Sequence, residues 1–266
     1  MRLIFIFTLL TCATTYRQTR LFDLNKLDGD FDSFLSQKKV IVVGEMHGTT
    51  EVPQFVLHLM ELMSDKNSPL TVGLEIERNF QKEIDAFLIN GDFDKLLKLD
   101  YFKYPDGRTS VAMGELIKGL RKIEGIKVVC FDIESGLDAG VNRDSLMAVN
   151  LNNNFTDGQM IVLTGNLHAN LKEGYWRPNF KSAIHHFNRM KNFGDQLISL
   201  NTYFGGGTIW NCMKDGCKER DAGSNPAIRE RFGLDNFIGV YSEVHSSGYS
   251  GFVYFDKVTA SMPLVN

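Results

Sequence analysis

The chain has 266 residues, of which 43% are hydrophobic and 23% are charged, and its formal net charge is -3. This length and apolar content suffice for one large buried core or two smaller ones. The sequence has no excess of basic residues, which argues against nucleic acid as a partner.

The first fifteen residues have the pattern of a secretory signal peptide, in which Arg2 precedes the apolar run 3–10 and small residues follow. This run is too short to span a bilayer, which needs about 20 residues. A buried N-terminal strand is the alternative. Cys12 also loosely matches a lipoprotein cleavage site. We therefore expect an exported protein that is periplasmic, secreted or, if Cys12 is lipidated, anchored to a membrane.

After a polar lead-in at residues 16–38, short apolar runs alternate with segments of helical period. The predicted strands are Val40–Val43, Leu70–Ile76, Lys127–Ile133, Met160–Thr164 and Gln196–Leu200. The predicted helices between them are Val52–Ser64, Asn79–Leu88, Val111–Ile123 and Asp144–Leu151. This alternation predicts a single α/β domain over residues 39–266, with a mainly parallel sheet and helices on both faces.

The last part of the chain changes character. A glycine-rich segment after Phe204 is expected to be a flexible loop. Two late strands, Ile238–Tyr241 and Gly251–Phe255, are expected at a sheet edge. Between them and the loop, Cys212 and Cys217 bracket a polar turn with a glycine. They predict a small disulfide loop, which persists only in an oxidising compartment, with a metal-binding pair as the alternative.

Polar side chains follow three of the predicted strands. Glu45 and His47 come directly after the first strand, and their spacing puts them on the same side of an extended chain. Glu75 lies near the end of the second apolar run, where a carboxylate is costly unless it is paired or bound to a cation. Asn166 and His168 follow the fourth strand. Because ligands bind at the carboxyl ends of the strands in open α/β sheets, we expect a site there.

Imidazoles and carboxylates at neighbouring strand ends can hold a divalent metal or carry out general acid–base chemistry. Arg143, just before a predicted helix, is either a solvated charge or a residue that binds an anion. Glu51 and Asp132 have two possible roles each. Either they belong to the site, or Glu51 is an acid favoured by the helix dipole and Asp132 caps the next turn.

For the other histidines and for Cys130 the sequence predicts no part in this site. We expect His58 to pack or lie at the surface, and His185 and His186 to be solvated. Nothing in the sequence supports a role for His245. Cys130, inside an apolar run, is expected to be a buried thiol.

The segments GEMHGTTE, GLEIERNFQKEIDAFL, GIKVVCFDI, RDSLMAVNL and VLTGNLHA occur in this order between residues 39 and 200. In this the chain resembles the ChaN-like, haem-binding-uptake/Tiki superfamily, which includes the erythromycin esterases. The resemblance implies an α/β fold with a site centred on Glu45, His47, Glu75 and His168. Some members of this group resemble metal-dependent proteases, some are esterases that use a histidine to activate water, and some are haem-binding cell-surface lipoproteins.

The favoured function is that of an exported hydrolase acting on an ester or peptide bond of a small-molecule or peptide substrate. His47 or His168 is the base for a water molecule, or both bind a divalent metal with Glu45 and Glu75. In the metal-free case the two glutamates orient the imidazoles. Arg143 stabilises an oxyanion or holds an acidic group of the substrate. The alternative is a haem- or ligand-binding protein without turnover, with His47, His168 or Tyr249 as the axial ligand of non-covalent haem.

Overall fold

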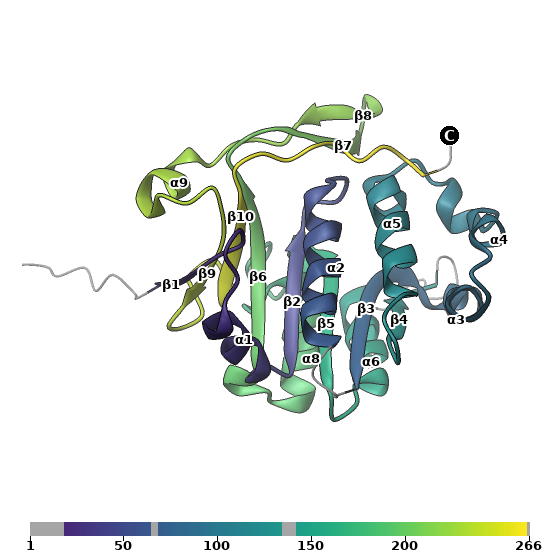
Figure 1. Ribbon diagram of the computed structural model, residues 1–266, viewed down its shortest axis with the longest axis horizontal. Helices are drawn as coiled ribbons and strands as arrows, with labels where there is room; N and C mark the ends of the chain where they lie inside the picture. The colour runs from purple at the N-terminus through teal and green to yellow at the C-terminus, as the bar shows by residue number, and fades with distance from the viewer. Residues whose placement is uncertain (1–18, 65–68, 135–141, 265–266) are drawn as a thin grey trace, which may run out of the picture.

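The computed structural model describes residues 19–64, 69–134 and 142–264. The predicted signal peptide and Cys12 lie outside these residues. In the described part of the chain, a mixed sheet of eight strands is covered by helices on both faces, and a separate two-stranded hairpin lies beside it (Figure 1). None of the helices in these ranges combines the length and apolar character that a membrane crossing requires.

The main sheet is parallel over most of its width. Its strands are β1 (Thr19–Asp23), β2 (Val40–Glu45), β3 (Leu70–Glu77), β4 (Lys127–Asp132), β5 (Gln159–Gly165), β6 (Leu197–Phe204), β9 (Asn236–Tyr241) and β10 (Gly251–Phe255). Their order is β1-β9-β10-β6-β2-β5-β3-β4, and neighbours from β10 to β4 are parallel. Only β9 runs against its neighbours. The predicted mainly parallel α/β fold is confirmed.

Helices form a layer on each face of the sheet (Figure 1). They are α1 (Gly29–Ser36), α2 (Glu51–Ser64), α3 (Gln81–Asn90), α4 (Phe93–Leu97), α5 (Val111–Leu120), α6 (Arg143–Asn154), α7 (Asn166–Ala169), α8 (Ala183–Lys191) and α9 (Pro226–Phe232). Single 3₁₀ turns are η1 (Arg78–Phe80), η2 (Asp100–Lys103), η3 (Gly107–Thr109) and η4 (Gly194–Gln196). Strand β2 shows how alternate residues of one strand pack under the two helix layers. Ile41 and Val43 join the core under α1, α2, α3 and α5, whereas Val40 and Val42 join the one under α6 and α8.

Helix α2 docks on the sheet through the face that its sequence period predicts. Phe55, Leu59 and Met63 are all buried, with Leu59 only 1% exposed. Full burial of such a side chain stabilises the fold by about 1.5–3 kcal/mol. The helix begins at Glu51, whose carboxylate accepts a hydrogen bond from the Thr259 amide at 2.9 Å. This acid therefore fixes the C-terminal segment as well as the helix start.

The expected edge position of the two late strands is wrong. Strand β10 lies between β6 and β9, and β9 is flanked on its other side by β1. The edge strand comes from the lead-in, which also supplies helix α1. Because this strand lies at the edge, only Phe22 of its sequence TRLFD is buried. The segment therefore has no apolar run by which a strand could be recognised.

The two-stranded hairpin, β7 (Thr208–Met213) and β8 (Gly216–Asp221), was not predicted, but its disulfide was. Cys212 and Cys217 are bonded and are direct partners across the hairpin. Their Cα atoms are 3.8 Å apart, which is closer than the usual range for a disulfide. Cys130 is a buried free thiol as expected, and burial raises its pKa.

Candidate functional site

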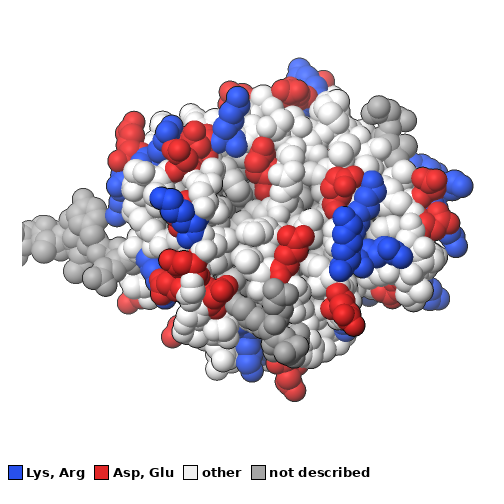
Figure 2. All heavy atoms as spheres, viewed as in Figure 1, with Lys and Arg blue, Asp and Glu red and all other residues white. Residues whose placement is uncertain are grey.

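A cavity of about 470 Å³ lies at the carboxyl ends of the central parallel strands. The five site residues predicted from the sequence, Glu45, His47, Glu75, Arg143 and His168, all line it. The rest of the wall comes from Met46, from residues 165–167 at the end of β5, from the loop around η3 and from hairpin β7–β8. Parallel packing explains the convergence, since β2, β3 and β5 are neighbours and end at the same edge. Away from the cavity, acidic and basic side chains are interspersed over the face in Figure 2.

Glu75 lies at the centre of the site and is 6% exposed. Its Oε2 accepts hydrogen bonds from Thr164 Oγ1 and from the Gly165 amide, both at 2.7 Å. Its Oε1 accepts from Arg143 Nη2 at 2.8 Å. A side chain at position 165 would crowd the site, because a Cβ there would come within 3.1 Å of His47 Nε2.

The charges around Glu75 keep it ionised. Burial alone would raise the pKa of its carboxyl group, but the charges of His47 and Arg143 and the hydrogen bond from the Gly165 amide lower it by a larger amount, to well below the usual range. The two imidazoles flank this carboxylate symmetrically. Nε2 of His47 is 3.9 Å from Oε2, and Nε2 of His168 is 3.9 Å from Oε1. Glu75 is thus an anion that already accepts three hydrogen bonds from the protein.

His47 presents a ring nitrogen to the cavity. Its Nδ1 is 2.9 Å from Glu45 Oε1, and the Glu45 carboxylate is 3% exposed. A carboxylate accepts hydrogen bonds, so Nδ1 carries the proton and the lone pair of neutral His47 is at Nε2. Burial lowers the pKa of His47, but Glu45 and Glu75 raise it more, and the net pKa lies above the ordinary value.

His168 is held differently. Its Nδ1 is 2.7 Å from Asp144 Oδ1, which also accepts a hydrogen bond from the Ala183 amide at 2.8 Å. Its Nε2 is 3.0 Å from Arg143 Nη1. A guanidinium can only donate, so Nε2 of His168 accepts and Nδ1 donates to Asp144. Both nitrogens of this imidazole are therefore engaged within the protein.

Arg143 is a structural centre of the site, and the alternative of a solvated charge is wrong. At the start of α6 it forms a two-pronged ion pair with Asp132, with Nε–Oδ1 at 2.8 Å and Nη2–Oδ2 at 2.7 Å. It also binds Glu75 and His168. Burial lowers the pKa of Arg143, but Asp132 and Glu75 raise it by a larger amount, so the net pKa is above the ordinary value and the side chain stays charged.

Arg108 is a site residue that sequence analysis missed. Its Nε and Nη2 donate to Asp106 Oδ2 at 3.1 and 2.8 Å. Its Nη1 lies 3.7 Å from Asp132 and 4.0 Å from Glu75, and has no hydrogen-bond partner among the described residues. In the sequence it follows Pro105-Asp-Gly, a turn pattern that gives no sign of the strand ends it approaches.

Two other contributors were also missed. Asp144, which orients His168, is the acidic residue after Arg143 at a helix start, and a helix-dipole role would account for it locally. Trp210 comes from the unpredicted hairpin and lines the cavity together with Asn211.

Several other candidates lie away from the cavity. Tyr249 is 2% exposed and its hydroxyl donates to the Asn166 carbonyl at 2.7 Å, so it does not face the site as a haem ligand would. His185 and His186, in α8, are partly buried rather than solvated, and their Nε2 atoms have no hydrogen-bond partner in the described part of the chain. His58 is exposed, and His245 stacks on Tyr241.

Two of the four residues proposed for a divalent metal are bound by a cation of the protein itself. Arg143 takes one oxygen of Glu75 and Nε2 of His168, so these atoms are not free for a metal. Within the described ranges, no group of three or more His, Cys, Asp or Glu residues is arranged to hold a metal ion. The arrangement fits arginine in the central position and does not fit the predicted metal set.

Fold and site together define an α/β protein with a water-accessible histidine, a buried carboxylate and two arginines at the ends of its parallel strands. No family model and no curated protein matches the sequence.

Solved structures do match the fold. A succinoglycan biosynthesis protein is 8% identical, with a TM-score of 0.67, and the match covers 88% of this chain and 91% of that one. A protein of Bacillus cereus is 13% identical, with a TM-score of 0.63 and coverages of 88% and 92%. A mutant of erythromycin esterase is 11% identical, with a TM-score of 0.60 and coverages of 94% and 100%. The resemblance found in the sequence is thereby confirmed at the level of the fold.

Proposed function

We propose that this chain is an exported hydrolase that cleaves a carboxylic ester or a peptide bond with His47 as the general base. The observation that carries the proposal is the Glu45–His47 pair, in which Nδ1 is held by a buried carboxylate and Nε2 is directed at the cavity. Such a pair fixes the tautomer and the orientation of a base, and it stabilises the imidazolium that forms.

The reaction needs one proton shuttle. Nε2 of His47 takes a proton from a water molecule as the oxygen attacks the carbonyl carbon of the substrate. A tetrahedral oxyanion forms, and when it collapses the proton on Nε2 passes to the leaving alcohol or amine. One water is consumed, the carbonyl fragment becomes an acid, and His47 returns to its neutral form. A positioned base of this kind contributes about 10²–10⁴-fold to the rate.

Neither of the other candidate bases is suited to this role. His168 already uses its Nε2 to accept from Arg143. Glu75 has a lowered pKa and accepts three hydrogen bonds, so it is a weak base. We therefore propose that both groups hold Arg143 in place and that Glu75 balances its positive charge.

Arg108 is the best placed group to stabilise the oxyanion. Its Nη1 borders the cavity without a hydrogen-bond partner among the described residues, whereas Arg143 is engaged at all three of its nitrogens. A donor aimed at developing negative charge is typically worth about 10²–10³-fold in rate.

The lining also bears on the substrate class. Met46, Leu167 and Trp210 are partly or largely exposed apolar residues around a charged floor. This combination suits a small substrate in which an apolar group flanks the reacting carbonyl. The Cys212–Cys217 disulfide supports an oxidising compartment and hence export.

The test is a hydrolysis assay with p-nitrophenyl butyrate and a panel of blocked dipeptides, on purified wild type and on His47→Gln. We expect wild-type turnover that the substitution abolishes. A parallel titration with haemin addresses the ligand-binding alternative. Absence of hydrolysis together with a stoichiometric Soret change that His47→Gln removes would overturn the hydrolase proposal.

A further inference from the structure

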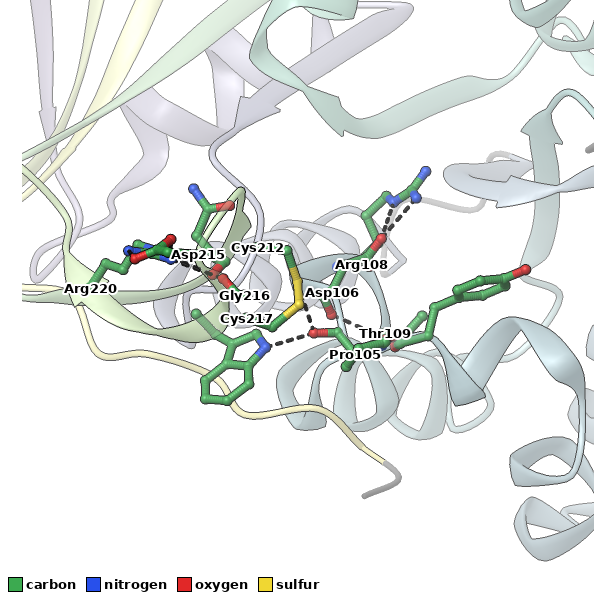
Figure 3. The surroundings of a disulfide bond; sticks show 12 residues. Pro105, Asp106, Arg108, Thr109, Cys212, Asp215, Gly216, Cys217 and Arg220 are labelled. Atoms are coloured by element: carbon green, nitrogen blue, oxygen red, sulfur yellow. Dashed lines mark hydrogen bonds and ion pairs between the residues drawn. A yellow bond between two sulfur atoms is a disulfide. The ribbon is translucent and has the colours of Figure 1, made fainter.

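Two side chains of hairpin β7–β8 meet the loop that carries Arg108 at the carbonyl oxygen of Pro105 (Figure 3). Nε1 of Trp210 donates a hydrogen bond to this oxygen at 2.7 Å. Sγ of Cys212 lies 3.3 Å from the same oxygen. In the disulfide this sulfur carries no proton, so Trp210 supplies the hydrogen bond and Cys212 only a contact.

The loop beyond Pro105 is closed on itself. Asp106 accepts from the Arg108 amide at 2.9 Å through Oδ1 and holds the Arg108 guanidinium through Oδ2. Thr109 Oγ1 donates to the carbonyl oxygens of Tyr104 and Asp106. Displacement of Pro105 therefore moves Arg108 with it as part of one small unit.

The same hairpin strand is fixed to the backbone beside His47. The Trp210 amide donates to the Gly48 carbonyl at 3.0 Å. The two chains approach so closely that a Cβ on Gly48 would lie 2.0 Å from the Trp210 carbonyl oxygen. A Cβ on Gly107 would in turn lie 2.5 Å from the Gly48 nitrogen. The backbone next to His47, the loop that carries Arg108 and the hairpin strand are thus packed closely together.

We propose that Trp210 is a positioning residue that acts through Pro105 to fix Arg108 against His47, and that the Cys212–Cys217 disulfide keeps the hairpin in the conformation that allows this. The catalytic part of this inference rests on the proposed hydrolase function. The disulfide matters because the hairpin pairs with no other strand of the described residues. A two-stranded hairpin alone is marginally stable, and a covalent cross-link between directly opposite residues compensates for that.

The kinetic test uses Trp210→Phe, which keeps an aromatic ring and removes the N–H donor. Trp176→Phe is the matched control, since Trp176 is exposed and packs on Phe180 away from the cavity. With p-nitrophenyl butyrate, Trp210→Phe should lower kcat about 10- to 100-fold with KM little changed, because a misplaced group loses transition-state interactions. Trp176→Phe should match wild type.

A double-mutant cycle shows whether Trp210 works through Arg108. If it does, Trp210→Phe has little further effect on kcat in an Arg108→Lys background, because the two changes remove the same interaction. Independent, multiplicative effects would overturn the positioning role.

A second readout needs no substrate. Trypsin cleavage after Arg108 and Lys103, mapped by mass spectrometry under native conditions, should be about fivefold faster in Trp210→Phe, the change expected from loss of one typical hydrogen bond. The Cys212→Ser/Cys217→Ser double variant should behave similarly, while Trp176→Phe and cleavage after Lys191 stay unchanged. Unchanged loop cleavage in both hairpin variants would refute the inference. If wild type shows no hydrolytic activity but the variants differ from it in loop cleavage as expected, the proposed function is refuted and the positioning role of Trp210 is not.

Discussion

Nη1 of Arg143 lies 3.0 Å from Nε2 of His168, and this contact separates the roles of the two site histidines. Because the guanidinium only donates, it occupies the lone pair that His168 would need to act as a base. His47 has no hydrogen-bond partner at Nε2 among the described residues, and its nearest carboxylate oxygen there is 3.9 Å away. Two histidines that look equivalent in the sequence are therefore not equivalent in the fold.

His47→Gln should abolish hydrolysis and leave the fold intact. We expect kcat to fall about 10²–10⁴-fold. The free energy of unfolding should change within the ordinary range of about 0.5–3 kcal/mol, because the side chain is partly exposed and contributes little apolar burial. The measurements are thermal melting and initial rates on the same preparations. An activity loss only in proportion to lost folded protein would make His47 a structural residue.

The rate should rise with pH through the pKa of His47. Its pKa is raised above 6.5 and the neutral form is the base, so kcat/KM should reach its plateau only on the alkaline side of that value. The stability effect has the opposite sign. A raised pKa contributes stability that is fully present below 6.5 and is lost as pH rises through the folded-state pKa.

The melting temperatures of wild type and His47→Gln at several pH values test that sign. The gap in favour of wild type should be larger at about pH 5.5 than at about pH 8.5. A gap that widens towards alkaline pH would contradict the assigned direction of the shift.

Glu75→Gln should destabilise the protein by about 3–5 kcal/mol, because it leaves Arg143 without one of the two carboxylates that pair with it. The lowered pKa of Glu75 contributes stability that is present above 4.5 and is lost as pH falls through the folded-state pKa. Urea unfolding at neutral and acid pH should therefore show the difference from wild type shrinking in acid. Equal stability of the two proteins at neutral pH would disprove a structural role for this carboxylate.

Dialysis against a chelator should leave hydrolysis unchanged. Arg143 already occupies the position between Glu75 and His168 that a metal would take. Metal content by elemental mass spectrometry, measured beside the rate, provides the check. Loss of activity on dialysis that zinc restores would show that the guanidinium is displaced by a metal in the active protein.

Leu59→Ala tests which face of α2 packs on the sheet. Leu59 is 1% exposed, and such a truncation typically costs about 2–5 kcal/mol through lost burial and the remaining cavity. His58→Ala, on the exposed face of the same helix, is the control and should change the free energy of unfolding by less than about 0.5 kcal/mol. Similar effects of the two substitutions would show that the helix face is misassigned.

Local sequence patterns were enough to predict the buried strands, one helix face and part of the site. Apolar runs such as Val40–Val43 specify the buried strands, and the helical period of Phe55, Leu59 and Met63 specifies the face that packs on them. The alternation of an extended chain places Glu45 and His47 on one side, and parallel pairing brings Glu75 and His168 to the same edge. The disulfide was also predictable, because its cysteines flank a short turn.

The role of each polar group in the site became clear from the three-dimensional contacts. Arg108, Asp144 and Trp210 reach the site through loop and hairpin contacts whose partners are distant in the sequence. The choice between His47 and His168 depends on a guanidinium 25 residues from His168 along the chain. Hydrophobic periodicity reports whether a residue is buried, but the pairing of donors with acceptors depends on how the loops fold over the strand ends, and no local pattern records that geometry.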